Sequence, residues 1–402
     1  MDNILDISNN NIYITIGIVV VIVFVLIYLL IVINKKSKNC KTIESSNDID
    51  NDGNKFIEDF YTINNSIKND YFEGNVKLGT KTINYDYKLK DFYVKTAYNA
   101  CASGKFKNDY VDLCALENCA KKGVRGLDFQ IYSKNDKPIV AVSKTKTNMM
   151  KDSYNELSLD EVMASVKSNF LQTNPNVNGS VLKNDPLFLF FRIHYGSNET
   201  RETNDNYEDK LTAFYNNIYS ILNDNLSNVK SKFNSIEMGN LYDDNDKARM
   251  ISLMNMKDTK NKIFLFVSTN DVDTSIIKKS NLNNIVDIYM DDINMKQYRI
   301  TDLNSNDKIS ISTDNKRNLS ICYPDWEYSL STNYNFLSPM SLGVQFVAMN
   351  FQNNDQNLKN YNKYFIQQYG NNSSSNKTSP FIKKPDTLIA FPSELTSFFS
   401  NI

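Results

Sequence analysis

The sequence predicts an α/β protein whose main part is a distorted, TIM-like (β/α)8 barrel, preceded by one transmembrane helix. Apolar runs typical of buried strands alternate with amphipathic segments between Phe92 and Val267, which favours a barrel. No glycine-rich phosphate loop follows the first of these strands, which disfavours a doubly wound nucleotide fold. A long uncharged apolar run near the N-terminus adds the membrane segment.

The membrane segment is Ile12–Ile33, which contains no charged residue and has close to the ~20 residues needed to cross a bilayer. It is longer than the apolar region of a signal peptide, and no positively charged region precedes it. Asp2 and Asp6 come before it, whereas four lysines follow between residues 35 and 41. The positive-inside rule therefore predicts a single-pass protein whose large C-terminal part is cytoplasmic.

Composition excludes several classes of protein. The chain has 402 residues, 41% of them hydrophobic, which is enough for a sizeable core. Its 45 basic and 46 acidic residues give a net charge of −1, so no basic surface indicates a nucleic-acid partner. Five cysteines without a CxxC spacing, together with one histidine, disfavour zinc and favour reduced thiols in a reducing compartment.

The chain divides into five segments by composition. Residues 1–36 are the membrane anchor, and residues 37–85 form a polar tether and lead-in to the barrel. Residues 86–269 carry the strand and helix signals of the first half of the barrel. Residues 270–317 are polar and poorly periodic, which suggests a linker or insertion, and residues 318–402 supply the second half.

The elements of the first half follow from apolar runs and helical spacing. Buried strands are expected at Phe92–Ala97, Pro138–Val142, Pro186–His194 and Lys262–Val267, and helices at Tyr110–Lys122, Leu157–Leu171 and Tyr207–Leu222.

The central stretch is Lys121–Tyr132, KKGVRGLDFQIY, in which a lysine-rich helix end and a glycine turn lead into an alternating strand. The alternation puts Asp128 and Gln130 on one face near the strand's end. Barrels present their chemistry at the C-terminal ends of their strands, so this face is the candidate site.

Three segments of the first half, AYNACASGKF, KKGVRGLDFQIY and KPIVAV, together resemble the X box of phosphoinositide-specific phospholipase C. In the second half, GVQFVAMNFQ from Gly343 resembles the last barrel strand of the Y box, and Lys384-Pro385-Asp386 resembles the turn that follows it. The resemblance implies a barrel of the phospholipase-C-like phosphodiesterase type, with residues 86–269 as the X-box-like half and residues 318–402 as the Y-box-like half.

The resemblance implies that this chain lacks the catalytic histidines of the family. The family uses two histidines, as general base and general acid, on a phosphodiester. Tyr98 stands where the first should precede Asn99, and Val142, followed by Ser143 and Lys144, stands where the second should be. The single histidine, His194, is at a position that the family does not use for catalysis, and we expect it to be structural. No catalytic residues are therefore expected.

The resemblance also implies a disrupted calcium site. Asn99 and Asp128 match family ligands, but Gln130 and Arg192 stand where carboxylates should be, and calcium does not tolerate a guanidinium among its ligands. We therefore expect no cofactor. Arg192 could act as a phosphate clamp, as an arginine does in the bacterial branch, but the simpler expectation is an ion pair with Asp128.

Head-group recognition is altered as well. Family lysines at the end of the fifth strand are replaced by Phe266 and Ser268, and an arginine by Ile321, although Tyr323 is retained. The vestigial pocket expected from the resemblance comprises Tyr98, Asn99, Asp128, Gln130, Lys144, Arg192 and Tyr323.

Two hypotheses about function follow, with a third that sets the resemblance aside. The first is a membrane-anchored pseudoenzyme that binds a lipid head group weakly or a protein partner. The second is an active phosphoinositide phosphodiesterase in which Tyr98 and Lys144 carry protons. The third is an unrelated α/β domain. The abundance of Asn, Lys, Ile and Tyr indicates an AT-rich genome, and a tethered, decayed enzyme would suit the membrane of a large DNA virus.

Overall fold

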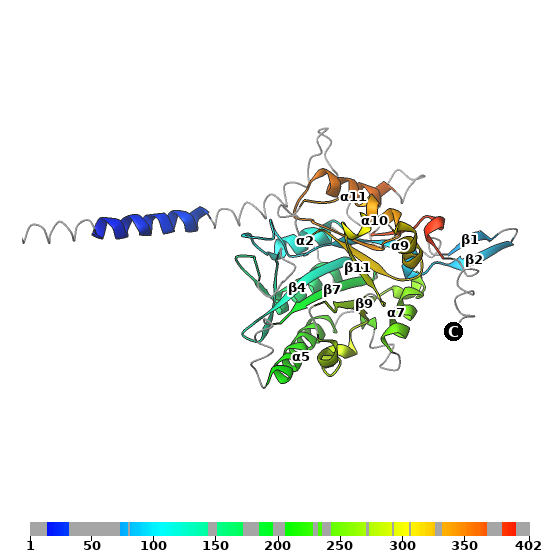
Figure 1. Ribbon diagram of the computed structural model, residues 1–402, viewed down its shortest axis with the longest axis horizontal. Helices are drawn as coiled ribbons and strands as arrows, with labels where there is room; N and C mark the ends of the chain where they lie inside the picture. Colours follow the sequence, from blue (N-terminus) through cyan, green and yellow to red (C-terminus); the bar gives the residue numbers. More distant parts are fainter. Residues whose placement is uncertain are drawn as a thin grey trace, which may run out of the picture.

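The computed structural model describes residues 14–31, 73–78, 81–143, 151–171, 185–195, 206–227, 232–234, 243–270, 273–291, 293–304, 307–325, 332–367 and 380–390. The apolar segment forms a helix over Ile14–Ile31, and none of it is buried in the protein. Figure 1 shows this helix standing apart from the barrel. Its length and composition suit a membrane span; the outer residues of the predicted Ile12–Ile33 lie outside the described residues.

The barrel is one sheet whose main path runs β10-β9-β7-β4-β3-β13-β12-β11, and neighbours along this path are parallel. The strands are β3 (Phe92–Ala97), β4 (Gly126–Lys134), β7 (Leu187–His194), β9 (Lys262–Ser268), β10 (Ile288–Met290), β11 (Lys296–Arg299), β12 (Ser320–Tyr323) and β13 (Phe346–Met349). This arrangement confirms the predicted α/β barrel. Because all these strands are parallel, their C-terminal ends meet at one rim.

Shorter strands extend the sheet. They are β5 (Lys137–Ala141) and β6 (Leu157–Ser158) beyond β4, β8 (Lys232–Phe233) beside β9, and β14 (Phe381–Lys383), which pairs antiparallel with β3. A separate antiparallel hairpin of β1 (Glu73–Leu78) and β2 (Lys81–Asp86) projects from the barrel on the side away from the apolar helix Ile14–Ile31 (Figure 1).

Helices follow most strands and cover the sheet. They are α2 (Leu113–Lys121), α3 (Leu159–Val166), α5 (Tyr207–Leu226), α7 (Asp244–Ser252), α8 (Thr274–Ile277), α9 (Lys308–Asn315), α10 (Leu337–Ser341) and α11 (Gln356–Gln367). Sequence signals explain where they begin. Asp112 caps α2, and Ser158 and Glu161 form a capping box at the start of α3. Gly123, with φ of +68°, provides the turn between α2 and β4.

The segment 270–317 differs from its prediction as a linker. It contributes β10 and β11, which pair parallel with β9 and β12. The segment therefore supplies the two end strands of the barrel sheet. Its strands were missed because they have three and four residues, too few for a period to show.

Aromatic side chains fill the barrel interior. Phe188 and Phe190 of β7, Phe266 of β9 and Phe346 of β13 are fully buried. Ring centroids are 4.9 Å apart for Phe190 and Phe346 and 5.2 Å apart for Phe188 and Phe346. Side chains of the described strands therefore pack the barrel interior, and Phe266 belongs to that core.

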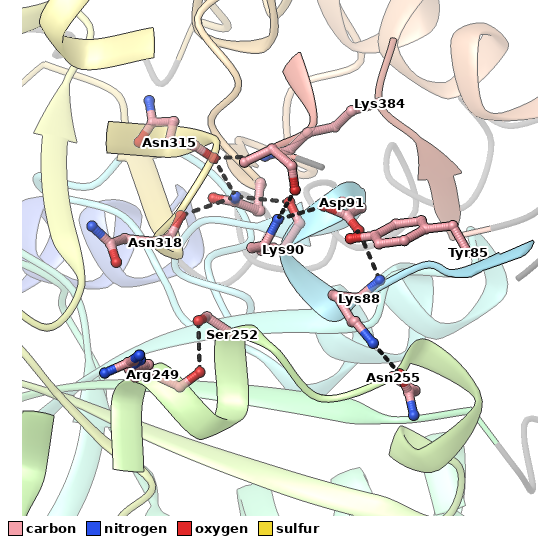
Figure 2. A network of polar contacts seen from close by, with 12 residues as sticks. Tyr85, Lys88, Lys90, Asp91, Arg249, Ser252, Asn255, Asn315, Asn318 and Lys384 are labelled. Atoms are coloured by element: carbon pink, nitrogen blue, oxygen red, sulfur yellow. Dashed lines mark hydrogen bonds and ion pairs between the residues drawn. The ribbon is translucent and has the colours of Figure 1, made fainter. Parts of the chain in front are cut away.

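A buried polar network closes the opposite, N-terminal end of the barrel (Figure 2). Lys90 and Asp91 form an ion pair at 2.9 Å, and the backbone N–H of Lys384 donates to the Asp91 carbonyl at 2.8 Å. The Lys384 Nζ donates to the Asn315 carbonyl at 3.0 Å, and Gln345 Nε2 donates to the Lys90 carbonyl at 3.1 Å. The Lys-Pro turn of the second half is thus fixed to the start of the first.

Cysteine usage departs in part from the expectation of reduced thiols. Cys101, Cys119 and Cys322 are free and buried, as expected for core thiols. Cys114, in α2, is disulfide-bonded. Disulfides are rare in reducing compartments, so this residue bears on the proposed topology.

Candidate functional site at the C-terminal rim

The sheet brings most of the predicted pocket residues to one place. Tyr98 and Asn99 directly follow β3, Asp128 lies in β4 and Arg192 in β7, three strands that are adjacent in the sheet. Asn99 has a φ of +44°, a left-handed conformation that asparagine tolerates better than most residues. This turn lets the Asn99 backbone N–H donate to Asp128 Oδ2 at 2.9 Å. Backbone and side chains therefore converge on one carboxylate.

Arg192 is the centre of this cluster. Its Nε donates to Asp128 Oδ1 at 2.8 Å and its Nη2 to Asp128 Oδ2 at 2.6 Å, a bidentate ion pair. The same Nη2 donates to Asn99 Oδ1 at 2.8 Å, and Nη1 donates to the Tyr98 hydroxyl at 3.3 Å. The predicted ion pair between Arg192 and Asp128 is confirmed. Burial would lower the pKa of Arg192, but the Asp128 carboxylate more than offsets this, and the pKa lies above its ordinary value.

These side chains are closed off from solvent within the described structure. Exposed fractions are 0% for Asp128, 2% for Asn99, 4% for Tyr98 and 5% for Arg192. Phe106 packs edge-on against Tyr98, with ring centroids 5.4 Å apart, and forms part of the cover. The arrangement resembles a structural core more than an open substrate site.

Arg299, at the end of β11, is a member of the cluster that was not predicted. Its Nη1 donates to the Pro324 carbonyl at 2.6 Å and to the Tyr98 hydroxyl at 3.4 Å. In the parallel register it lies beside Tyr323 of β12, and its guanidinium is 5.1 Å from that ring. It was missed because β11 lies in the segment assigned as a linker; its register with the retained Tyr323 is the signal that could have identified it.

The two tyrosines respond oppositely to this environment. Burial raises the pKa of the Tyr98 phenol, but the positive charges of Arg192 and Arg299 outweigh that effect and the net pKa is lowered. For Tyr323, burial and the Asp128 carboxylate dominate, and the pKa lies well above its usual value. Tyr98 is thus the more readily ionised phenol of the pair.

Other predicted residues are not part of the Arg192 cluster. Gln130 accepts hydrogen bonds from the Ser143 backbone N–H at 2.7 Å and from the Tyr132 hydroxyl at 2.9 Å, so it holds the β4–β5 edge. Val142 is buried just beyond β5. His194 is buried at the end of β7 with its ring 4.8 Å from that of Tyr132, as expected for a structural imidazole. Lys144 lies outside the described residues.

The residues present do not fit a calcium ion. Asn99 Oδ1 and both carboxylate oxygens of Asp128, the two positions that match family ligands, are bonded to the Arg192 guanidinium. Within the described ranges, no group of three or more His, Cys, Asp or Glu side chains could hold a metal ion. A guanidinium bonded to these oxygens repels a cation and leaves calcium without its ligands.

Part of the chain matches the model of a known protein family. Residues 265–386 match the family model described as phosphatidylinositol-specific phospholipase C, Y domain. The protein is phospholipase-C-like. The match begins upstream of the predicted second half and includes all of segment 270–317, in agreement with the strands found there. No curated protein matches the chain.

Solved structures share the fold of this phospholipase-C-like protein. PLC21 from S. officinalis superposes with a TM-score of 0.54 at 14% identity, over 76% of this chain and 38% of that one. PLC21 from L. pealei gives a TM-score of 0.53 at 15% identity, over 75% and 38%. The chain thus spans well under half of these proteins' length, and the shared feature is the barrel. The alternative of an unrelated α/β domain is ruled out.

Proposed function

We propose that this protein is a membrane-anchored phospholipase-C-like pseudoenzyme, a barrel that binds or organises a partner at a membrane without hydrolysing phosphodiesters. The observation that carries the proposal is the Arg192 guanidinium, bonded to Asn99 and to both oxygens of Asp128 in a buried site. Its charge offsets that of Asp128, and it occupies the acceptors that a catalytic cation would need.

The groups available for proton transfer also favour the pseudoenzyme proposal. Two-histidine acid–base catalysis needs a second imidazole, and the chain contains one histidine. That residue, His194, is buried against Tyr132. Loss of the base, the acid and the cation site together favours a non-catalytic role.

The test is a turnover assay on the full chain in lipid nanodiscs containing phosphatidylinositol or its phosphorylated forms, with calcium and with a chelator. We expect no release of inositol phosphate above that of empty nanodiscs under either condition. Release that disappears in Asp128→Asn would overturn the proposal.

A second candidate function rests on Tyr98. Tyr98 stands at the position that the resemblance gives to the family's first histidine; Arg192 and Arg299 lower the pKa of its phenol and both donate to its oxygen, so it loses its proton more readily than an ordinary tyrosine. A phenolate can act as a general base in an active phosphodiesterase. If turnover is found, Tyr98→Phe should abolish it, whereas an unchanged rate would exclude Tyr98 as the base.

The partner of the pseudoenzyme is proposed to be a lipid head group or a protein on the same membrane. Binding of nanodisc-embedded protein to fluorescent soluble inositol phosphates distinguishes the two. Saturable binding supports a head group; its absence, with specific crosslinking to a membrane protein, supports a protein partner.

We also propose that the barrel lies on the cytoplasmic side of its membrane, from the charge asymmetry around the span. The disulfide at Cys114 argues for an oxidising side instead. Protease protection of the chain in sealed microsomes decides between them. A barrel degraded without detergent supports the cytoplasmic side, and a protected, N-glycosylated barrel contradicts it.

A further inference from the structure

The barrel sheet has an open side between β10 and β11. These strands end the path of the sheet, and within the described residues no backbone ladder joins them. A side-chain hydrogen bond crosses the opening, from Gln297 Nε2 of β11 to the Met290 carbonyl of β10 at 3.0 Å. Short strands with an unpaired edge open more easily than the centre of a sheet, so this side needs another closure.

Two guanidinium groups and two tyrosine rings lie against one another at the rim above this opening. The Arg192 guanidinium is 4.7 Å from the Tyr98 ring and 5.2 Å from the Tyr323 ring. The Arg299 guanidinium is 5.9 Å and 5.1 Å from the same two rings, whose centroids are 5.6 Å apart. Each cation therefore contacts both rings.

The four side chains come from both sides of the opening. Arg192 belongs to β7, on the side of the sheet that ends in β10, whereas Arg299 belongs to β11 itself. Tyr98 follows β3 and Tyr323 ends β12. Apart from the pair of Arg299 and Tyr323, whose strands are neighbours, the contacts with these rings join strands that make no ladder with one another. Arg192 is also fixed by Asp128, which gives the cluster a rigid side.

We propose that these four residues, which we call the rim clasp (Tyr98, Arg192, Arg299 and Tyr323), close the open side of the barrel in place of a β10–β11 ladder. Side chains at the position of a phospholipase site then have a structural role of their own. The inference goes beyond the proposed loss of catalysis and stands whether or not turnover is found, because hydrogen exchange tests it without any lipid substrate.

The ring of Tyr323, and not its hydroxyl, carries its part of the clasp. The Tyr323 hydroxyl is buried and has no hydrogen-bond partner among the described residues. Tyr323→Phe keeps the ring and removes only this oxygen, whereas Tyr323→Leu removes the aromatic face. The pair separates stacking from hydrogen bonding at one position.

The experiment is hydrogen–deuterium exchange of the full chain in nanodiscs, read by mass spectrometry over peptides from β10, β11, β4 and β7. For Arg299→Met and Tyr323→Leu we expect roughly tenfold faster exchange in β10 and β11, with β4 and β7 unchanged, as loss of a cation–π contact predicts. Tyr323→Phe should match the parent protein. Arg317→Met is the matched control, because Arg317 is also half-buried but precedes β12 at the other end of the barrel.

The double variant Arg299→Met/Tyr323→Leu provides the stricter test. Arg299 and Tyr323 share one contact, but each also contacts another member of the rim clasp. The double variant should therefore exchange faster in β10 and β11 than either single variant, but by less than the product of the two single effects. Unchanged exchange in Arg299→Met, uniform acceleration of all four strands, or a multiplied effect in the double variant would each overturn the rim clasp.

Discussion

Arg299 and Tyr323 lie side by side in the parallel register of β11 and β12, with the guanidinium 5.1 Å from the ring centroid. This pair connects a strand from segment 270–317 to the retained tyrosine of the Y-box-like half. It places a second arginine beside a polar site that already contains Arg192, and the predictions about that site follow from its charge.

Removing Arg192 should destabilise the barrel strongly. Arg192→Met leaves the Asp128 carboxylate buried without its cation, which typically costs about 3–5 kcal/mol of unfolding free energy. Chemical unfolding in detergent, followed by intrinsic fluorescence, measures the loss. The double variant Arg192→Met/Asp128→Leu should recover much of it; a single variant as stable as the parent would contradict a buried ion pair.

Tyr98 should make stability depend on alkaline pH. The pKa of Tyr98 is lowered in the folded protein, so between that pKa and the ordinary value near 10 the unfolded chain binds more protons. The contribution of Tyr98 therefore stabilises the fold increasingly as pH rises through this window. Tyrosinate absorbance during a pH titration should show one early transition, and Tyr98→Phe should remove both the transition and the slope.

Lys95 should also make the unfolding free energy rise with pH, because burial lowers the pKa of its amine. This lysine of β3 is buried with its Nζ bonded to the Lys122 carbonyl at 2.7 Å, and burial lowers its pKa to about 7. Above that pH the folded protein holds the neutral amine while the unfolded chain stays protonated to about 10.4. Stability should therefore rise between these values and be flat below pH 7.

Lys95→Met checks this assignment. It should be more stable than the parent near neutral pH, by an amount on the order of 1 kcal/mol or more, and should lack the slope above pH 7. Equal slopes in the two proteins, measured by thermal unfolding across pH, would show that Lys95 does not titrate as inferred.

Gly126 should not tolerate even a methyl group. A Cβ at this position of β4 would lie 2.5 Å from Thr96 Oγ1 and 2.9 Å from its Cγ2, in the neighbouring strand. Gly126→Ala should therefore lower the unfolding free energy by about 1–3 kcal/mol. The second-site change Thr96→Ala removes both clashing atoms, and Gly126→Ala/Thr96→Ala should unfold close to Thr96→Ala alone.

Much of the first half could be predicted from sequence because its strands are long and apolar. The eight residues of β7 form a continuous run, and the glycine turn before β4 is a strong local signal. The pairing of Arg192 with Asp128 followed from charge, since a buried carboxylate at a strand end needs a cation. Local pattern and global fold agree in these places.

The rest escaped prediction for physical reasons. β10 and β11 are too short for alternation, and their identity depends on pairing with β9 and β12. Arg299, which lies in β11, was not predicted for the same reason. Gln130 was placed in the pocket by strand alternation and by the family resemblance. Its amide oxygen instead accepts from the Ser143 N–H and from the hydroxyl of Tyr132 in its own strand, which side-chain periodicity cannot show.

The position of β3 between β4 and β13 has a consequence for biosynthesis. Val94 pairs with Phe346, so the first barrel strand keeps an open edge until ribosomes have made nearly the whole chain. A ribosome-bound intermediate would therefore expose apolar strand edges for an extended time, and we expect it to bind chaperones.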